Sequence, residues 1–219
     1  MSREKRILCF GDSNTWGCKP LTIVDGTPLA GTRFSDEERW TGILAQNPDY
    51  TIIEEGLGGR TTAFPDPAQP WLTGINYFEA CVLSHDPLDL LIIMLGTNDL
   101  KTHVCNSTDA SAMAVMRMVK MGLNVVSKPF KVLIVAPTAI KPERLQRAPR
   151  VFDQTSIENS RRFGEVYRQQ AELNGYAFLD AAEFAEPSDI DQVHWDAAGH
   201  AAFAKAVEEK LKEIFKNDS

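Results

Sequence analysis

The stretch LDLLIIMLGTND, residues 88–99, indicates the fold class of this chain. Its apolar run from Leu90 to Leu95 is short, continuous and rich in Ile and Leu, and it ends in the turn residues Gly-Thr-Asn-Asp. Such a run is typical of a strand whose two faces are both covered, as in a parallel sheet. We therefore expect this segment to be the most central strand, with Asn98 and Asp99 at its carboxyl end.

Four similar runs lie on either side of this stretch. They are RILCFG (6–11), YTIIEEG (50–56), FKVLIVAP (130–137) and YAFLD (176–180). Helical spacing of apolar residues occupies 36–46, 108–126, 155–174 and 196–215. Strands that alternate with helices predict a three-layer α/β/α, flavodoxin-like domain with a five-stranded parallel sheet. A length of 219 residues fits one such domain over 1–219.

The charge balance argues against some classes of partner. The chain has 30 acidic and 23 basic residues, a formal net charge of −7, which disfavours nucleic acid and anionic membranes. Its longest apolar run is far below the roughly 20 residues of a membrane span. The apolar stretch before Gly11 is too short for a signal peptide. We expect a cytoplasmic protein with a small organic substrate.

The cysteines do not form a recognisable metal or redox motif. Cys9, Cys18, Cys81 and Cys105 include no C-x-x-C pair and have no histidine at zinc-finger spacing. We expect free thiols, and we expect neither a metal nor a cofactor at the functional site.

Four polar turn motifs lie at or beyond strand ends. They are GDSN (11–14), GLGGRTT (56–62), GTND (96–99) and DQVH (191–194). In a parallel sheet the carboxyl ends of the strands share one edge, where ligands bind. The four motifs should therefore converge there, together with long loops over 64–71 and 136–149.

The residues in these motifs suit acyl transfer. A serine hydroxyl needs a base within hydrogen-bond reach and a carboxylate that orients the base. Ser13, His194 and Asp191 supply these groups, in an order that is known for catalytic triads. The backbone N–H groups of Ser13 and Gly58 and the side-chain amide of Asn98 could bind the oxyanion.

Each of these residues also has an ordinary structural interpretation. Ser13 alone fits a turn or a cap, and Asn98 fits a helix cap. Among the rival residues, His200 fits a packing histidine and Asp196 an N-cap. A metal site built from the histidines and aspartates of this region is disfavoured by their spacing.

Other polar and aromatic residues near the motifs have less specific interpretations. We expect Asp12 and Asp99 to brace their turns, and Arg60 fits either a surface charge or a pocket residue. Trp16, three residues from Ser13, is the best pocket candidate among the tryptophans. Trp40 and Trp71 are further pocket candidates, although a tryptophan at an apolar position is more often a core residue than a ligand contact.

Taken together, the four blocks resemble those of the SGNH (GDSL) hydrolase family over nearly the whole chain. RILCFGDSNTWG, RWTG, IIEEGLGGRTT and LDLLIIMLGTND are similar to its bacterial arylesterase and acyltransferase branch. The resemblance implies Ser13 as nucleophile, His194 as base and Asp191 as the orienting acid. It also implies an oxyanion hole of Ser13, Gly58 and Asn98. Asn14 stands where the name motif has leucine, and Gly59 where the branch often has alanine.

The implied activity is hydrolysis of short-chain esters through an acyl-enzyme, with acyl transfer to alcohols as a further option. The resemblance also implies that the chain assembles into a homo-oligomer. A carbohydrate acetylesterase or a lysophospholipase-like enzyme is the alternative. A non-catalytic binding module is disfavoured by the presence of all four blocks. A nucleotide-binding protein is disfavoured because GLGGRTT lacks a full G-x-G-x-x-G pattern.

Overall fold

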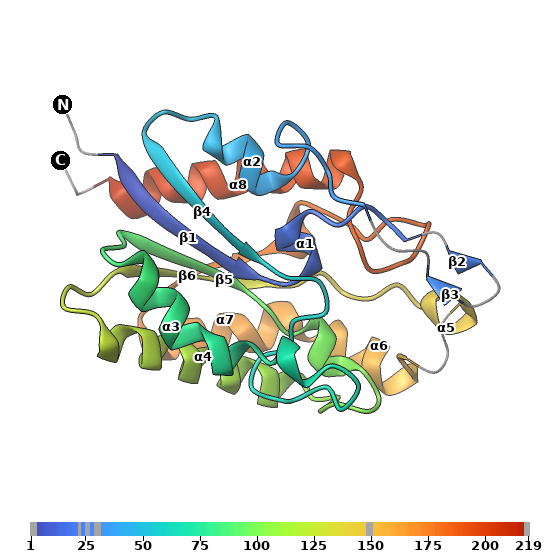
Figure 1. Ribbon diagram of the computed structural model, residues 1–219. Coiled ribbons are helices and arrows are strands. Elements are labelled where there is room, and N and C mark those ends of the chain that lie inside the picture. The colour runs from blue at the N-terminus through green and yellow to red at the C-terminus, as the bar shows by residue number, and fades with distance from the viewer. Residues whose placement is uncertain (1–3, 22, 25–26, 29–31, 148–150, 217–219) are drawn as a thin grey trace.

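A five-stranded parallel sheet runs through the middle of the protein in the order β4-β1-β5-β6-β7 (Figure 1). The computed structural model describes residues 4–21, 23–24, 27–28, 32–147 and 151–216. The strands are β1 (Lys5–Gly11), β4 (Tyr50–Gly56), β5 (Leu90–Met94), β6 (Lys131–Ala136) and β7 (Ala177–Asp180). All five expected strands are present, and the expected five-stranded parallel α/β sheet is confirmed.

Helices cover both faces of this sheet (Figure 1). On one face lie α2 (Trp40–Ala45) and α8 (Ala197–Phe215), and on the other α3 (Gly74–His85), α4 (Thr108–Val125) and α7 (Phe163–Asn174). Alternate residues of β1 serve the two cores: Ile7 and Cys9 pack with Trp40, whereas Leu8 and Phe10 pack in the cluster of the second face. This alternation explains why the strands are apolar without interruption.

Two helix boundaries differ from the sequence-based expectation. The segment 36–46 becomes helical only at Trp40, because Arg39 just before it bonds the carboxylates of Asp36 and Glu54 in a turn. The segment 155–174 is two helices, α6 (Gln154–Ser160) and α7. Ser156 of α6 donates to the carbonyl of Leu100, while α7 packs on the sheet, so the chain changes direction between them.

Helix α3 has no counterpart among the expected elements. It buries Phe78, Cys81 and Val82 but leaves the apolar side chains of Tyr77 and Leu83 exposed. Because exposed and buried apolar residues are mixed along it, its sequence does not display a clear apolar stripe.

Shorter elements lie around the carboxyl edge of the sheet. They are α1 (Ser13–Trp16), the antiparallel strands β2 (Ile23–Val24) and β3 (Thr27–Pro28), the 3-10 helices η1 (Pro70–Leu72), η2 (Thr97–Leu100) and η3 (Ala181–Glu183), and α5 (Arg144–Arg147). The expected loop 64–71 thus runs into η1, and the expected loop 136–149 contains α5. Residues 148–149 of that loop lie outside the described residues.

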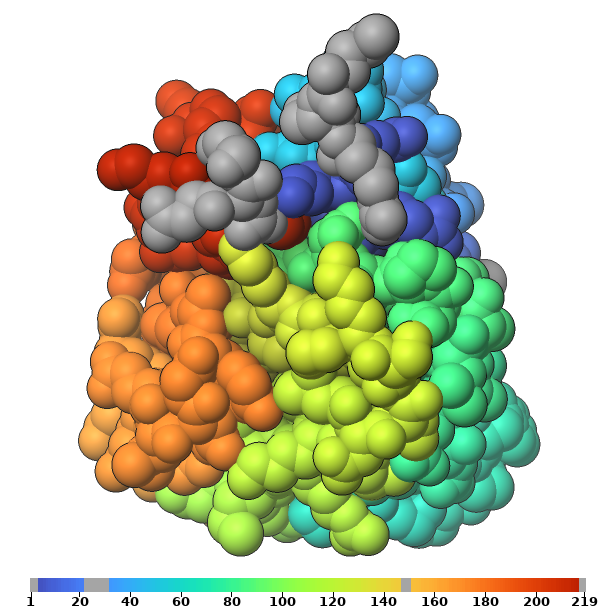
Figure 2. All heavy atoms as spheres, turned by 90° about the vertical axis from the view of Figure 1, so that its left-hand side faces the viewer, coloured from blue at the N-terminus to red at the C-terminus, as the bar shows by residue number. Residues whose placement is uncertain are grey.

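Close packing at the ends of β1 and β4 sets the position of α1. A Cβ atom on Gly56 would lie 2.2 Å from the backbone nitrogen of Trp16, so only glycine lets the end of β4 approach α1 this closely. The opposite end of the molecule, where the strands begin, is shown in Figure 2 and includes surface from α4 and α7. In the described part of the chain, no helix has the length and apolar character of a membrane span.

Candidate active site

Ser13 is the first residue of α1, directly after β1. The Asp12 carboxylate accepts a hydrogen bond from the Asn14 backbone N–H at 3.1 Å, which caps this short helix. The Ser13 Oγ lies 2.8 Å from the Nε2 of His194. The capped turn therefore presents the hydroxyl to the loop before α8, which supplies the imidazole.

The second nitrogen of the His194 ring lies against Asp191. Its Nδ1 is 2.6 Å from Asp191 Oδ2. Because a carboxylate can only accept, Nδ1 carries the proton and Nε2 is left to accept from the Ser13 hydroxyl. The three expected residues are thus brought together in one hydrogen-bonded line.

Asp191 is fully buried and is held by backbone donors. Its Oδ1 accepts from the N–H groups of Val193 at 3.0 Å and His194 at 2.9 Å, and its Oδ2 accepts from Leu21 N–H at 2.6 Å. Burial raises the pKa of Asp191, but the hydrogen bond and charge of His194 and these backbone donors outweigh it and hold the pKa below its usual value. The carboxylate is therefore kept ionised next to the imidazole.

The expected oxyanion donors border the same cleft. Ser13, Gly58 and Asn98 line a cleft of about 610 Å³ together with His194 and Trp16. The Asn98 Nδ2 donates to the Arg60 carbonyl at 3.2 Å. This bond uses one amide hydrogen and fixes the side chain, which leaves the second hydrogen for a ligand. Gly58 lies beside Ser13: a Cβ atom added to Gly58 would lie 4.0 Å from Ser13 Cβ, an ordinary contact distance.

Asn14 is a site residue that sequence reasoning noted only as a departure from the name motif. Its Nδ2 donates to the carbonyl of Val193 at 3.4 Å, and its Oδ1 accepts from the N–H of Trp195 at 3.2 Å. These partners flank His194 on both sides. Asn14 thus ties the loop that carries the imidazole to the helix that carries the hydroxyl, and no local sequence pattern could have indicated this.

Arg60, which the sequence left open, is a structural residue. It is buried, it donates to the backbone carbonyls of Gly11 and Glu55, and its guanidinium stacks over the Phe10 ring at 4.1 Å. It does not line the cleft. It bonds the carboxyl ends of β1 and β4 to the loop that follows β4.

The rival histidine and aspartate have the structural roles expected of them. The Asp196 carboxylate accepts from Gly199 N–H at 2.8 Å and caps α8. His200 is fully buried between the rings of Phe34 and Trp195. Burial lowers the pKa of His200 to about 4, so this ring is a neutral packing residue.

The two carboxylates expected to brace their turns do so. Asp12 caps α1, and Asp99 accepts from the backbone N–H and the hydroxyl of Thr62. Burial raises the pKa of Asp12 to about 6 and of Asp99 to about 7, although the bonds from Asn14 and Thr62 oppose it. Asp12 and Asp99 are the chain neighbours of Ser13 and Asn98, and neither of them lines the cleft.

The tryptophans divide differently from the expectation. Trp16 lines the cleft, and Trp40 is a core residue with 1% of its surface exposed, both as expected. Trp71 is 72% exposed. Neither interpretation of Trp71 holds, because η1 carries it onto the surface, away from both the core and the lining of the cleft.

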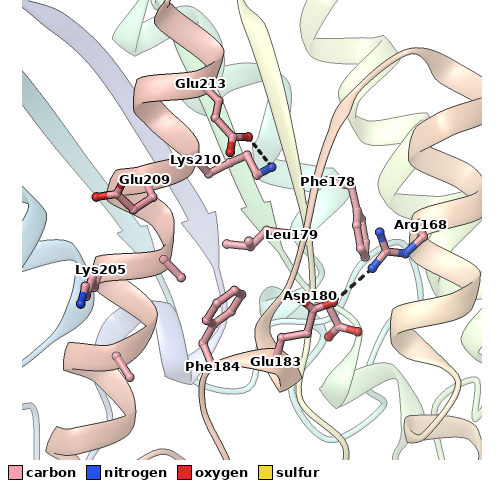
Figure 3. Close-up of a pocket in the computed structure, with 12 residues that line it drawn as sticks. Arg168, Phe178, Leu179, Asp180, Glu183, Phe184, Lys205, Glu209, Lys210 and Glu213 are labelled. Carbon is pink, nitrogen blue, oxygen red and sulfur yellow. Dashed lines mark hydrogen bonds and ion pairs between the residues drawn. The ribbon is translucent and has the colours of Figure 1, made fainter.

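A second hollow, of about 570 Å³, lies between α7 and α8 at the edge strand β7 (Figure 3). Phe178 and Phe184 form an apolar part of its wall, and the ion pairs Arg168–Glu183 and Lys210–Glu213 lie along the hollow. It contains none of the residues described above, so it plays no part in the chemistry of the cleft.

Comparisons with known proteins agree with this geometry. The model of the GDSL-like Lipase/Acylhydrolase family matches residues 9–202. A comparison with curated protein sequences gave no match. Among solved structures, the aryl esterase of M. smegmatis is 34% identical with a TM-score of 0.87, over 95% of this chain and 99% of that chain.

Two further structures extend the comparison. A carbohydrate acetylesterase from Sinorhizobium meliloti is 33% identical with a TM-score of 0.85, over 96% of this chain and 100% of that chain. A lipolytic protein of the G-D-S-L family from Veillonella parvula, at 16% identity and a TM-score of 0.65 over 94% and 97% of the two chains, shares the fold. The chain thus belongs to the GDSL-like lipase/acylhydrolase family and is a carboxylic ester hydrolase of the SGNH type.

Proposed function

We propose that this enzyme hydrolyses short-chain carboxylic esters through an acyl-enzyme on Ser13. The observation that carries the proposal is the line of hydrogen bonds from Ser13 Oγ through the His194 ring to the Asp191 carboxylate, 2.8 Å and 2.6 Å long. A hydroxyl activated in this way attacks an ester carbonyl, whereas a binding module has no need for such a line.

The reaction then has two halves. His194 takes the hydroxyl proton as Ser13 Oγ bonds to the carbonyl carbon, and it returns that proton to the departing alcohol or phenol. In the second half His194 removes a proton from water as the water oxygen bonds to the acyl carbon, and it then returns that proton to Ser13 Oγ as the acyl–Oγ bond breaks and the acid is released. Asp191 stabilises the imidazolium in both halves, while the backbone of Ser13 and Gly58 and the Asn98 amide donate to the oxyanion.

The lining of the cleft favours small, partly apolar esters. Trp16, Leu57, Val151 and Phe152 contribute apolar surface beside the hydroxyl. An aryl or short alkyl ester fits such a lining, in keeping with the similarity to the M. smegmatis aryl esterase. We further propose that an alcohol can replace water in the second half, because an apolar wall favours an organic acceptor over water.

Carbohydrate acetylesterase activity is the second candidate. It is favoured by the polar side chains Gln69 and Lys101 in the same lining and by the similarity to the S. meliloti enzyme. Rates with aryl acetate, butyrate and octanoate esters and with an acetylated sugar separate the two candidates. An acetylated sugar turned over faster than every aryl ester would reverse this order.

Ser13→Ala tests the chemistry itself. We expect turnover of a p-nitrophenyl ester to fall by about 10⁴ or more with an unchanged circular dichroism spectrum, and a sulfonyl fluoride reagent to label Ser13 in the wild type. Ser35→Ala, at an exposed position outside the cleft, is the control and should keep full activity. Labelling of another serine would contradict the assignment.

We also propose that residues 1–219 form one domain that assembles into homo-oligomers. The exposed side chains of Trp71 and Tyr77 support this, because they leave apolar surface uncovered near the loop over 64–71. Light scattering should give a mass that is a multiple of 24.4 kDa. A mass of one chain at the concentration used for assays would refute the assembly.

A further inference from the structure

Three side chains with metal-binding atoms meet outside the cleft, between β4 and α3. Cys81 and His85 are four residues apart on α3 and so lie on one face of that helix. Glu55, on β4, faces them, and the ligand atoms of the three residues all lie within 4.8 Å of one another. None of the three lines the cleft that contains Ser13.

Two of the contacts around this group are made to one carboxylate oxygen of Glu55. The Nε2 of His85 lies 3.0 Å from Glu55 Oε1, and the Tyr77 hydroxyl donates to the same oxygen at 3.2 Å. Cys81 is fully buried, whereas the side chains of His85 and Glu55 keep 29% and 19% of their surface exposed. A dissolved ion can therefore reach the group through its outer two members.

We propose that Glu55, Cys81 and His85 form a binding site for a divalent cation of the zinc class. Thiolate, imidazole and carboxylate are the three ligand types that zinc takes in proteins. With metal–ligand bonds of about 2.0 to 2.3 Å, tetrahedral geometry requires roughly 3.3 to 3.6 Å between ligand atoms. The His85–Glu55 pair, at 3.0 Å, needs to open by a few tenths of an ångström, whereas pairs near the 4.8 Å limit of the group need to close by roughly 1.2 to 1.5 Å. Solvent completes the fourth position.

Charge balance supports a divalent ion here despite the neighbouring Arg60. On binding, the Cys81 thiol releases its proton to solvent and bonds the metal as thiolate. Thiolate and Glu55 carboxylate then neutralise both charges of the ion, so Arg60 faces a site without net positive charge. Without a metal, burial and the charge of Glu55 raise the pKa of the Cys81 thiol to about 12, and the Arg60 guanidinium opposes this only in part, so the metal itself has to displace the thiol proton.

Cobalt and zinc titrations of the full chain test the site. We expect one Co²⁺ per chain, with the visible bands of tetrahedral cobalt and a thiolate-to-cobalt charge-transfer band, both removed by zinc. Cys81→Ser should abolish the charge-transfer band, and His85→Gln should weaken binding by about tenfold or more. Because His85 is partly exposed, its replacement tests the site even if Cys81→Ser does not fold.

Cys105→Ser and His103→Gln are matched controls. Cys105 is a partly exposed thiol, and His103 is a surface histidine whose Nε2 lies 3.2 Å from the carboxylate of Asp66. Both variants should bind cobalt as the wild type does. Absence of saturable binding, binding unchanged by Cys81→Ser or His85→Gln, or a charge-transfer band lost in Cys105→Ser would each overturn the proposal.

Discussion

Replacing Asn98 by alanine separates catalysis from stability at the proposed oxyanion hole. Asn98 is not the cap of η2, because Gly96 occupies the N-cap position. One hydrogen of its side-chain amide is bonded to the Arg60 carbonyl. Because the amide is planar, this bond also fixes the direction of the second hydrogen. Loss of a transition-state donor costs about 3 to 4 kcal/mol, a fall in kcat of roughly 10² to 10³. KM should change little.

The same change also has a smaller structural cost. It leaves the Arg60 carbonyl without this donor, which costs about 1 to 2 kcal/mol and lowers the melting temperature by roughly 2 to 8 °C in a chain of this size. Asn159→Ala is the matched control, since Asn159 Nδ2 donates to the Asn106 carbonyl at 2.7 Å away from the cleft. It should lose stability and keep kcat.

The measurement is kcat and KM for a p-nitrophenyl ester, with thermal unfolding of each variant. If Asn98→Ala keeps wild-type kcat and loses only as much stability as Asn159→Ala, Asn98 does not bind the oxyanion. The reasoning from its second amide hydrogen would then be refuted.

Three further tests, with four substitutions, address the proposed triad and the residues around it. Asn14→Leu removes both hydrogen bonds to the loop of His194, so kcat should fall by about 10² while Ser13 still reacts with a sulfonyl fluoride. An unchanged kcat would show that these two bonds do not position His194. Asp191→Asn should lower kcat by about 10⁴. Asp196→Asn, which keeps a good N-cap, should lower kcat by less than about twofold. Equal losses in the two variants would contradict the choice of Asp191 as the orienting acid. Burial raises the pKa of Asp99 from 3.8 to about 7, so the folded state binds the carboxyl proton more tightly than the unfolded state does. This binding stabilises the folded state fully below about pH 4, and the stabilisation is lost as the pH rises through about 7. The urea-derived free energy of unfolding, wild type minus Asp99→Asn, should therefore fall from pH 4 to pH 8, and a constant or rising difference would refute this.

The sheet could be predicted from the sequence because its strands are buried on both faces. A run such as Leu90 to Leu95 has no polar residue at which another structure could begin. The convergence of Ser13 and Asn98 followed from the same prediction, since parallel strands end at one edge. The final helix was predictable because Asp196 caps it before a regular apolar stripe.

Other features depend on contacts between distant parts of the chain. The bonds of Asn14 to the loop of His194 join residues about 180 positions apart in the chain. The backbone N–H of Leu21 donates to Asp191, which lies 170 residues further along the chain. No local propensity encodes such pairs. The break between α6 and α7 was likewise not visible, because it arises from what each half packs against rather than from a helix-breaking residue.

The bond between Ser13 and His194 closes a loop of 181 residues. During synthesis the proposed nucleophile emerges first, and its proposed base emerges 181 residues later. On the proposed mechanism, a chain that is partly made or partly folded holds a serine without a base and cannot attack esters. Ester turnover is for this reason a direct reporter of complete folding, and in refolding experiments its recovery should follow the slowest step that seats the segment before α8.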